Sequence, residues 1–211
     1  MTDKTSSSPP SSAWLRWVVG SFVLSMAYAV IRYHVFGTTP WAHMPVFTTN
    51  KAISVASLFA LAGAFVVNGA AARARLGITG FGLAVLHVLM TLSILGPATY
   101  PKLYEGDRVN FLGEVAMLTG CLATVLLFLP ATATATAIRE QLGPARWRSW
   151  QRAGLVAVAC VGLHVTAIGF RGWLKPEAWP GYLPPITLGS LLIALVPFVV
   201  GRKQRRAQLE D

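Results

Sequence analysis

Long apolar runs separated by short polar segments dominate the chain. A run of about 18 or more apolar residues is long enough to cross a bilayer as a helix. Six such runs occur, at about residues 14–33, 52–70, 76–96, 110–130, 152–170 and 183–200. The pattern predicts an all-α membrane protein, a six-helix transmembrane bundle over residues 13–201. It also predicts a polar, disordered N-terminal tail (1–12) and a basic C-terminal tail (202–211), with no soluble catalytic domain.

Composition and charge placement support this class. Hydrophobic residues make up 54% of the chain and charged residues 12%, which is about half the charged share of a soluble domain. Of the 18 lysines and arginines, twelve lie before the first run, after the last, and in alternate loops. The positive-inside rule then places both termini in the cytoplasm. The net charge of +10 is therefore explained by topology and contact with anionic lipid, not by nucleic-acid binding.

Two features near the spans allow more than one interpretation. Ala27-Tyr28-Ala29 resembles a signal-peptidase site, but the segment before it is long, which favours an uncleaved first helix. Cys121 and Cys160 both fall within spans, so they are expected to be buried structural thiols and say little about redox compartment.

Two histidines lie inside the third and fifth predicted spans. His87 is eleven residues from the predicted cytoplasmic start of its helix, and His164 is twelve residues from its own. At about 1.5 Å per residue, both lie roughly 16–18 Å from the same membrane face. An ionisable side chain at that depth is costly and usually functional. Two imidazoles at one height on neighbouring helices are what a six-coordinate haem iron requires.

Short side chains accompany both histidines at helical spacing, which leaves room for a flat cofactor between helices. On the His87 face they are Gly77, Gly80 and Ala84, and on the His164 face Ala153, Ala157 and Cys160. Plain helix packing, with each histidine hydrogen-bonded across the contact, explains the same residues. Metal transport is a weaker interpretation, because no carboxylate or third ligand lies beside the pair.

Two stretches resemble the ferric-reductase-like transmembrane family. One begins at Arg73-Ala74-Arg75-Leu76-Gly77 and runs to Leu86-His87-Val88, and the other runs from Ile138-Arg139-Glu140-Gln141-Leu142-Gly143 through Trp147 and Gln151-Arg152 to His164. Within that family the chain is most similar to the haem-binding membrane subunits of bacterial methionine sulfoxide reductase systems. The resemblance covers roughly residues 52–170.

The resemblance implies b-type haem held by His87 and His164, and electron transfer across a bacterial plasma membrane. Two-haem members carry a further histidine about thirteen residues before each ligand. Here those positions hold Arg73 or Ala74, and Gln151. A single haem is therefore expected, with FMN or FAD on the cytoplasmic side as its possible source of electrons.

Several other residues have two interpretations each. A basic cluster, together with Arg73 and Arg75, could bind a flavin phosphate or a haem carboxylate, or could simply set topology; its members are Arg139, Arg146, Arg148 and Arg152. Glu114 could receive protons at an outer substrate or quinone site, or pair with Arg108. His34 and His43 could contact a haem carboxylate or capture metal weakly, and otherwise are interfacial residues.

The leading hypothesis is an oxidoreductase subunit: a membrane cytochrome that passes electrons from a cytoplasmic reductase, flavin or quinol towards an outer acceptor. That acceptor could be a partner enzyme, ferric iron, oxygen or quinone. The alternative is a haem-free membrane scaffold that keeps the fold but not the chemistry. A small transporter is the third candidate, and its expected broken helices or midplane charges are not evident.

Overall fold

The computed structural model describes residues 12–210, with side chains described as far as residue 200. Within this part of the chain, six segments are long and apolar enough to cross a membrane. Their helices are α1 (Ala13–Val30), α2 (Thr49–Val66), α3 (Ala70–Ile94), α4 (Phe111–Thr132), α5 (Thr136–Trp173) and α6 (Ile186–Glu210). The six-helix prediction is confirmed. Residues 1–11 of the expected N-terminal tail lie outside the described residues.

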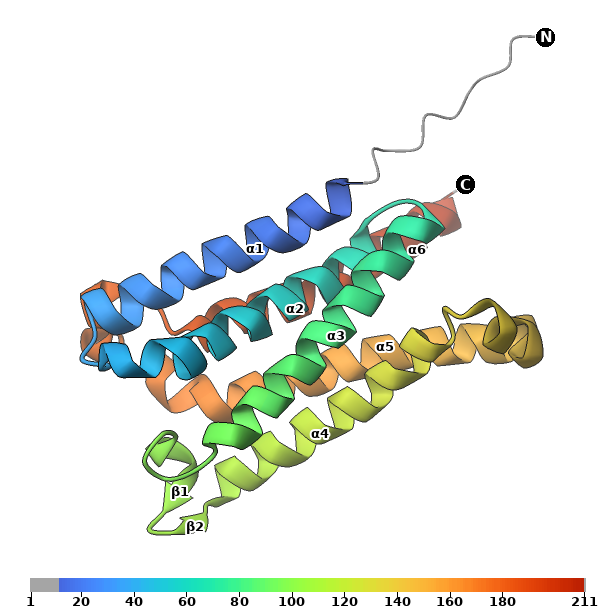
Figure 1. The fold of residues 1–211 in the computed structure, drawn as a ribbon. Helices are drawn as coiled ribbons and strands as arrows, with labels where there is room; N and C mark the ends of the chain where they lie inside the picture. The colour runs from blue at the N-terminus through green and yellow to red at the C-terminus, as the bar shows by residue number, and fades with distance from the viewer. Residues whose placement is uncertain (1–11, 211) are drawn as a thin grey trace, which may run out of the picture.

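The helices run up and down between two ends of one bundle (Figure 1). We call the end at which α1 begins and α6 ends the termini end. We call the other the hairpin end, because it carries the antiparallel strands β1 (Tyr104–Glu105) and β2 (Arg108–Val109). Helix α2 packs against α1, α3 and α6, while α4 and α5 pack closely on each other. Helices α3 and α5 therefore run in the same direction on opposite sides of a central space.

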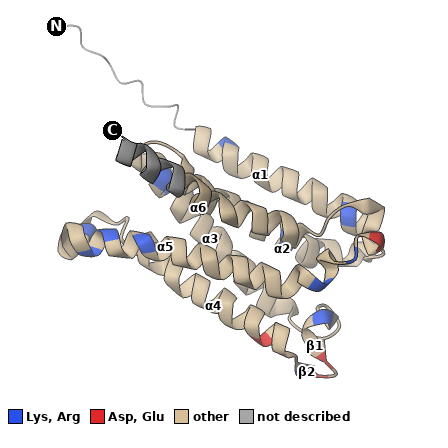
Figure 2. Cartoon of the chain, turned by 180° about the vertical axis from the view of Figure 1, so that it is seen from behind, with Lys and Arg blue, Asp and Glu red and all other residues tan. Residues whose placement is uncertain are grey.

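The outer surface of the bundle is apolar along its middle. Leu24, Leu118 and Val125 are between 66% and 70% exposed, although they are leucine and valine. Figure 2 shows that lysine, arginine, aspartate and glutamate gather at the two ends of the bundle. A surface of this kind is suited to lipid along its middle and to water at its ends. The molecule therefore has the character of a multi-pass membrane protein.

Several boundaries differ from those that hydropathy predicts. Helix α3 starts at Ala70 and not near residue 76, and α5 starts at Thr136 and not near residue 152. Polar residues continue a helix beyond its apolar part, and hydropathy does not detect them. A kink at Gly143, with φ of +67°, divides α5 where Pro144 follows. Pro197 lies within α6 and does not end it.

Short helical turns close the loops. They are π turns at Ile31–Val35 and Met44–Thr48, and 3-10 turns at Trp41–His43, Pro101–Leu103, Pro176–Ala178 and Pro180–Tyr182. Buried Arg32 donates a hydrogen bond to the carbonyl of Leu183, which ties the end of α1 to the segment before α6. The segments that connect the helices thus contain helical turns, and at the end of α1 one is held by a side-chain hydrogen bond.

Candidate functional site

A cavity of about 230 Å³ lies inside the half of the bundle nearest the hairpin end. Helices α2 and α3 form one wall, α4 and α5 the other, and the start of α6 and the α3–α4 loop complete it. Most of the wall is aliphatic, including Leu58, Val88, Val161 and Ile168. Both histidines that the sequence singled out line this cavity.

His87 projects from α3, and Asn50 at the start of α2 fixes its orientation. The Nδ1 atom of His87 donates to Oδ1 of Asn50 at 2.8 Å. The amide Nδ2 of Asn50 donates in turn to the hydroxyl of Thr91 at 2.8 Å, one helical turn after His87. Asn50 is only 1% exposed, so neither bond competes with water. This chain of bonds places the proton of His87 on Nδ1 and leaves Nε2 with a free lone pair.

His164 projects from α5 and is held by α4. Its Nδ1 atom donates to the backbone carbonyl of Ala116 at 2.7 Å. That carbonyl is available because Gly120, the residue that would normally cover it, has no side chain: a Cβ there would lie 2.9 Å from Nδ1 of His164. The glycine thus makes room for the imidazole ring. As at His87, the bond to Nδ1 leaves Nε2 unprotonated.

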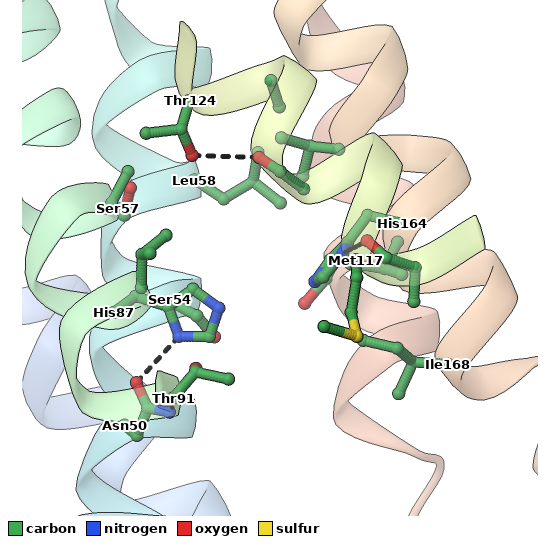
Figure 3. A pocket seen from close by; sticks show the side chains of 18 of the residues that line it. Asn50, Ser54, Ser57, Leu58, His87, Thr91, Met117, Thr124, His164 and Ile168 are labelled. Carbon is green, nitrogen blue, oxygen red and sulfur yellow. Dashed lines mark hydrogen bonds between the residues drawn. The ribbon is translucent and has the colours of Figure 1, made fainter. Parts of the chain in front are cut away.

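The two rings face the same space from opposite walls (Figure 3). No hydrogen bond to either Nε2 atom occurs within the described part of the chain. His87 lies seven residues before the end of α3 and His164 nine before the end of α5, about 10 Å and 14 Å from those ends. Each histidine thus lies in the second half of its helix, nearer the hairpin end than the sequence predicts, and both line the one cavity. Each side chain is only half-buried, because the cavity exposes it.

No protein-family model matches the chain, and no curated protein is similar to it. The site must therefore be interpreted from its own chemistry. Among the described residues, no group of three or more histidine, cysteine, aspartate or glutamate side chains could hold a metal ion. A metal ion bound by protein side chains alone would need such a group. Two opposed imidazoles are instead a ligand set for a metal that brings its own equatorial ligands.

The hairpin end of the cavity is its polar end. The ammonium of Lys51 lies 4.3 Å from the centre of the Phe47 ring and 5.2 Å from that of Tyr33. Lys51 also lines the cavity, together with Tyr100. Burial raises the pKa of the Tyr100 phenol, while hydrogen bonds with Asn50 and Thr91 act in the opposite direction. Tyr100 is therefore a neutral hydroxyl at physiological pH, and Lys51 supplies the positive charge.

The short side chains expected to frame a cofactor have different positions. Ala84 lines the cavity, as expected. Gly80 does not: a Cβ there would lie 2.8 Å from the Leu61 side chain, so Gly80 allows close contact between α3 and α2. Ala157 packs in the core with Leu61, and Cys160 is buried outside the cavity lining. Three of these residues thus serve helix packing, which was the alternative interpretation.

The arginines proposed for flavin or haem carboxylates lie at the termini end. Arg73 donates to the carbonyl of Val67 at 3.0 Å, and the Arg139 guanidinium lies over the Trp147 ring at 5.1 Å. Arg75, Arg146, Arg148 and Arg152 are exposed. None of the six lines the cavity. The structure therefore keeps this basic group apart from the histidines.

His34, His43 and Glu114, the remaining candidates from the sequence, also lie outside the cavity lining. His34 is buried, with Nδ1 bonded to the carbonyl of Thr39 and Nε2 to the hydroxyl of Thr48. It also stacks on Trp41, so it is a structural residue. His43 and Glu114 are exposed and lie outside the cavity lining.

Three residues essential to the geometry were missed from the sequence: Asn50, Thr91 and Gly120. Asn50 lies two residues before the apolar run predicted at 52–70, so the sequence did not assign it to a helix. Gly120 lies in an unremarkable apolar run, and only the fold shows that its neighbour is an imidazole. A backbone acceptor such as the Ala116 carbonyl leaves no trace in the sequence at all.

Proposed function

We propose that this protein is a membrane b-type cytochrome that binds one haem between His87 and His164. The observation that supports this proposal most strongly is the state of the two imidazoles. Each donates Nδ1–H to an acceptor supplied by a different helix, and each presents Nε2 to a shared apolar cavity. A histidine that ligates a metal is oriented by this kind of second bond. A histidine that only bridged two helices would not need a cavity in front of its other nitrogen.

The donor set fits haem better than other cofactors. His87 could hold a haem iron from one wall and His164 from the other, and the macrocycle would need apolar surroundings. The cavity offers both, with aliphatic residues between the rings and Lys51 at its polar end. When bound, the haem would supply reversible one-electron chemistry, while the protein supplies ligands, orientation and a low dielectric.

The residues around the cavity would serve the cofactor in distinct ways. Asn50 and the Ala116 carbonyl would hold the imidazole rings in position and raise their basicity. Gly120 would leave room for the His164 ring, and Ala84 would leave room for the cofactor. The aliphatic wall would exclude water and so limit the reorganisation that accompanies a change of charge.

We further propose that the hairpin end faces outward from a bacterial plasma membrane. The twelve-to-six distribution of basic residues supports this orientation. Electrons would then arrive from a separate reductase, a flavin or a quinol, and leave to an acceptor at the outer side. In this proposal the protein acts as an electron-transfer subunit between those two partners.

Electron paramagnetic resonance of the oxidised, purified protein tests the ligand assignment. Two imidazole ligands on ferric haem should give a low-spin signal in wild type. His87→Ala and His164→Ala should convert any remaining haem to a high-spin form. A high-spin signal in wild type would contradict ligation by both histidines. No haem in protein expressed with ample haem would leave the membrane-scaffold alternative.

A further inference from the structure

The cavity has an opening in its side wall, between α3 and α4. Leu92 on α3, and Met117 and Cys121 on α4, line the cavity and are also exposed, Leu92 at 61%. Lining residues deeper in the cavity, such as His87 and Thr124, are half-buried. The greater exposure of the first three indicates that they also have a surface on the outside of the bundle. The cavity wall is therefore incomplete at this place.

Side chains bound the opening at both of its ends. Towards the termini end, Phe81 on α3 and Phe128 on α4 meet edge-on, with their ring centres 6.3 Å apart. Towards the hairpin end, Tyr100 and Leu103 of the α3–α4 connection line the cavity. Helix α4 packs much more closely on α5 than on α3. Both α3 and α4 are long and apolar enough to span a membrane, so the opening faces the apolar surface of the bundle.

The other walls of the cavity are filled by side chains or carry charge. Towards the termini end, Leu61 and Leu127 line the cavity and pack on buried Ala157. Between α2, α5 and α6, the contact is filled by buried side chains, namely Leu58, Val158 and Ala194. The hairpin end holds the Lys51 ammonium and its aromatic neighbours. The α3–α4 opening is thus the direction in which a large apolar molecule meets least resistance.

The cofactor proposed for this cavity is itself a large and mostly apolar molecule. The flat body of haem favours a bilayer over water, because apolar surface is costly to hydrate. Binding of a metal normally releases protons from its ligands. Here the hydrogen bonds of His87 and His164 already leave each Nε2 unprotonated, so the iron can accept both lone pairs without the release of a proton into apolar surroundings. A haem that arrives from the bilayer therefore needs no aqueous step.

We infer that the α3–α4 opening is the portal through which haem enters its site from the bilayer. The portal is lined by Leu92, Met117 and Cys121 and bounded by the Phe81–Phe128 pair. This inference rests on the proposed function, because it concerns the loading of the same haem. Uptake and release pass over one barrier. A narrower portal therefore slows both by the same factor and leaves the affinity for haem unchanged.

The rate of haem release from the full-length holoprotein tests the portal. Wild type and Leu92→Trp are reconstituted in phosphatidylcholine vesicles, and haem transfer to excess apomyoglobin is followed by absorption. Release should slow about tenfold in Leu92→Trp, the effect that one overpacked side chain has on a barrier. The share of haem that the protein retains after equilibration with protein-free vesicles measures affinity, and this share should stay at the wild-type value.

A matched control places the same bulk on the same helix outside the portal. Leu89 on α3 is 60% exposed and does not line the cavity, so Leu89→Trp should release haem at the wild-type rate. A second pair of variants tests the opposite change. Phe128→Ala removes one side of the aromatic boundary and should speed release, while Leu122→Ala, at another exposed position on α4, should not.

Three results would overturn the portal. Release at the wild-type rate in both Leu92→Trp and Phe128→Ala would show that haem leaves by another route. Equal slowing in Leu89→Trp would show a general effect of bulk on the helix. A change in retained haem that accounts for the whole change in rate would assign the effect to affinity. In each of these cases the wild-type protein still holds its haem, so the cytochrome proposal stands. Wild-type protein that binds no haem would contradict both proposals.

Discussion

The two halves of the bundle are built from the same helices but differ in what lies between them. In the half towards the hairpin end, α3 and α5 face each other across a cavity, and each contributes a histidine. In the half towards the termini end, side chains fill the equivalent space: Phe81 contacts Phe128 edge-on, and Phe65 and Pro130 approach Gly154. The comparison teaches that a cofactor site in a helix bundle requires both ligand side chains and an unfilled space between the helices.

The polar residues of the two halves have different partners. At the hairpin end, Asn50 bonds to an imidazole, which leaves a ligand atom free. At the termini end, the side-chain amide of Gln151 donates to the carbonyl of Pro130 at 3.5 Å. Arg73 likewise bonds to a backbone carbonyl. These side chains stabilise the bundle and present nothing to a metal.

Loss of either histidine should have the largest effect on haem binding in the open half of the bundle. In His87→Ala or His164→Ala protein, haem should lose an axial ligand, and the low-spin spectrum should disappear. Haem content per chain, measured with pyridine haemochrome on purified protein of equal yield, checks this expectation. His43→Ala is the control, since His43 is exposed outside the cavity; equal loss there would show that the site has been misassigned.

Asn50→Leu should have the next largest effect. Leucine has a similar volume but cannot accept from Nδ1 of His87, so the ring loses its fixed orientation. Removal of such a partner typically lowers metal affinity by about 10- to 100-fold. The rate of haem transfer to apomyoglobin measures this effect. Ser57→Ala, which removes another α2–α3 hydrogen bond, from Ser57 to the Gly80 carbonyl, should leave that rate near wild type. If the rate of haem transfer rose equally in Ser57→Ala, the effect of Asn50→Leu would be due to helix packing and not to the lost bond with His87.

Gly120→Ala should have a smaller effect of the same kind. The new Cβ would lie 2.9 Å from Nδ1 of His164, so the ring must shift away from the Ala116 carbonyl. Overpacking at the low end of the usual range, about 1 kcal/mol, corresponds to about fivefold weaker haem binding. The same transfer assay detects it. Gly77→Ala adds its Cβ to open space, and a similar loss there would argue against the steric explanation.

Added ligands at the termini end should have no effect on haem stoichiometry. In Ala74→His, Gln151→His protein, two histidines occupy the positions that a second haem would need. Leu61, Leu127 and Ala157 pack together below the cavity with Phe81 against them, so we expect too little space there for a second macrocycle. Haem content should stay near one per chain. A rise to two would show that ligands alone decide the number of haems.

The sequence predicts the six helices well because a membrane imposes a strong and simple pattern on each span. It also predicts the matched height of His87 and His164, since a helix converts residue number directly into distance. The starts of α3 at Ala70 and of α5 at Thr136 were missed because the first residues of these helices do not belong to a long apolar run.

The details of the site were harder to predict than its ligands. Short side chains at Gly80, Ala157 and Ala84 look alike in sequence, but only Ala84 lines the cavity. Whether a small residue makes room for a neighbouring helix or for a cofactor depends on helix rotation and tilt. Those follow from packing over the whole bundle, not from local spacing. The bonds from His87 to Asn50 and from His164 to Ala116 join residues 37 and 48 positions apart.

The reduced-minus-oxidised absorption spectrum of the purified protein, with the haem quantified per chain, tests the central claim most directly. The account predicts a sharp low-spin b-type α-band and close to one haem per chain, held at the hairpin end. Protein that contains no haem despite ample supply would contradict the cytochrome proposal. Two haems per chain would contradict the contrast between the open and the filled half of the bundle.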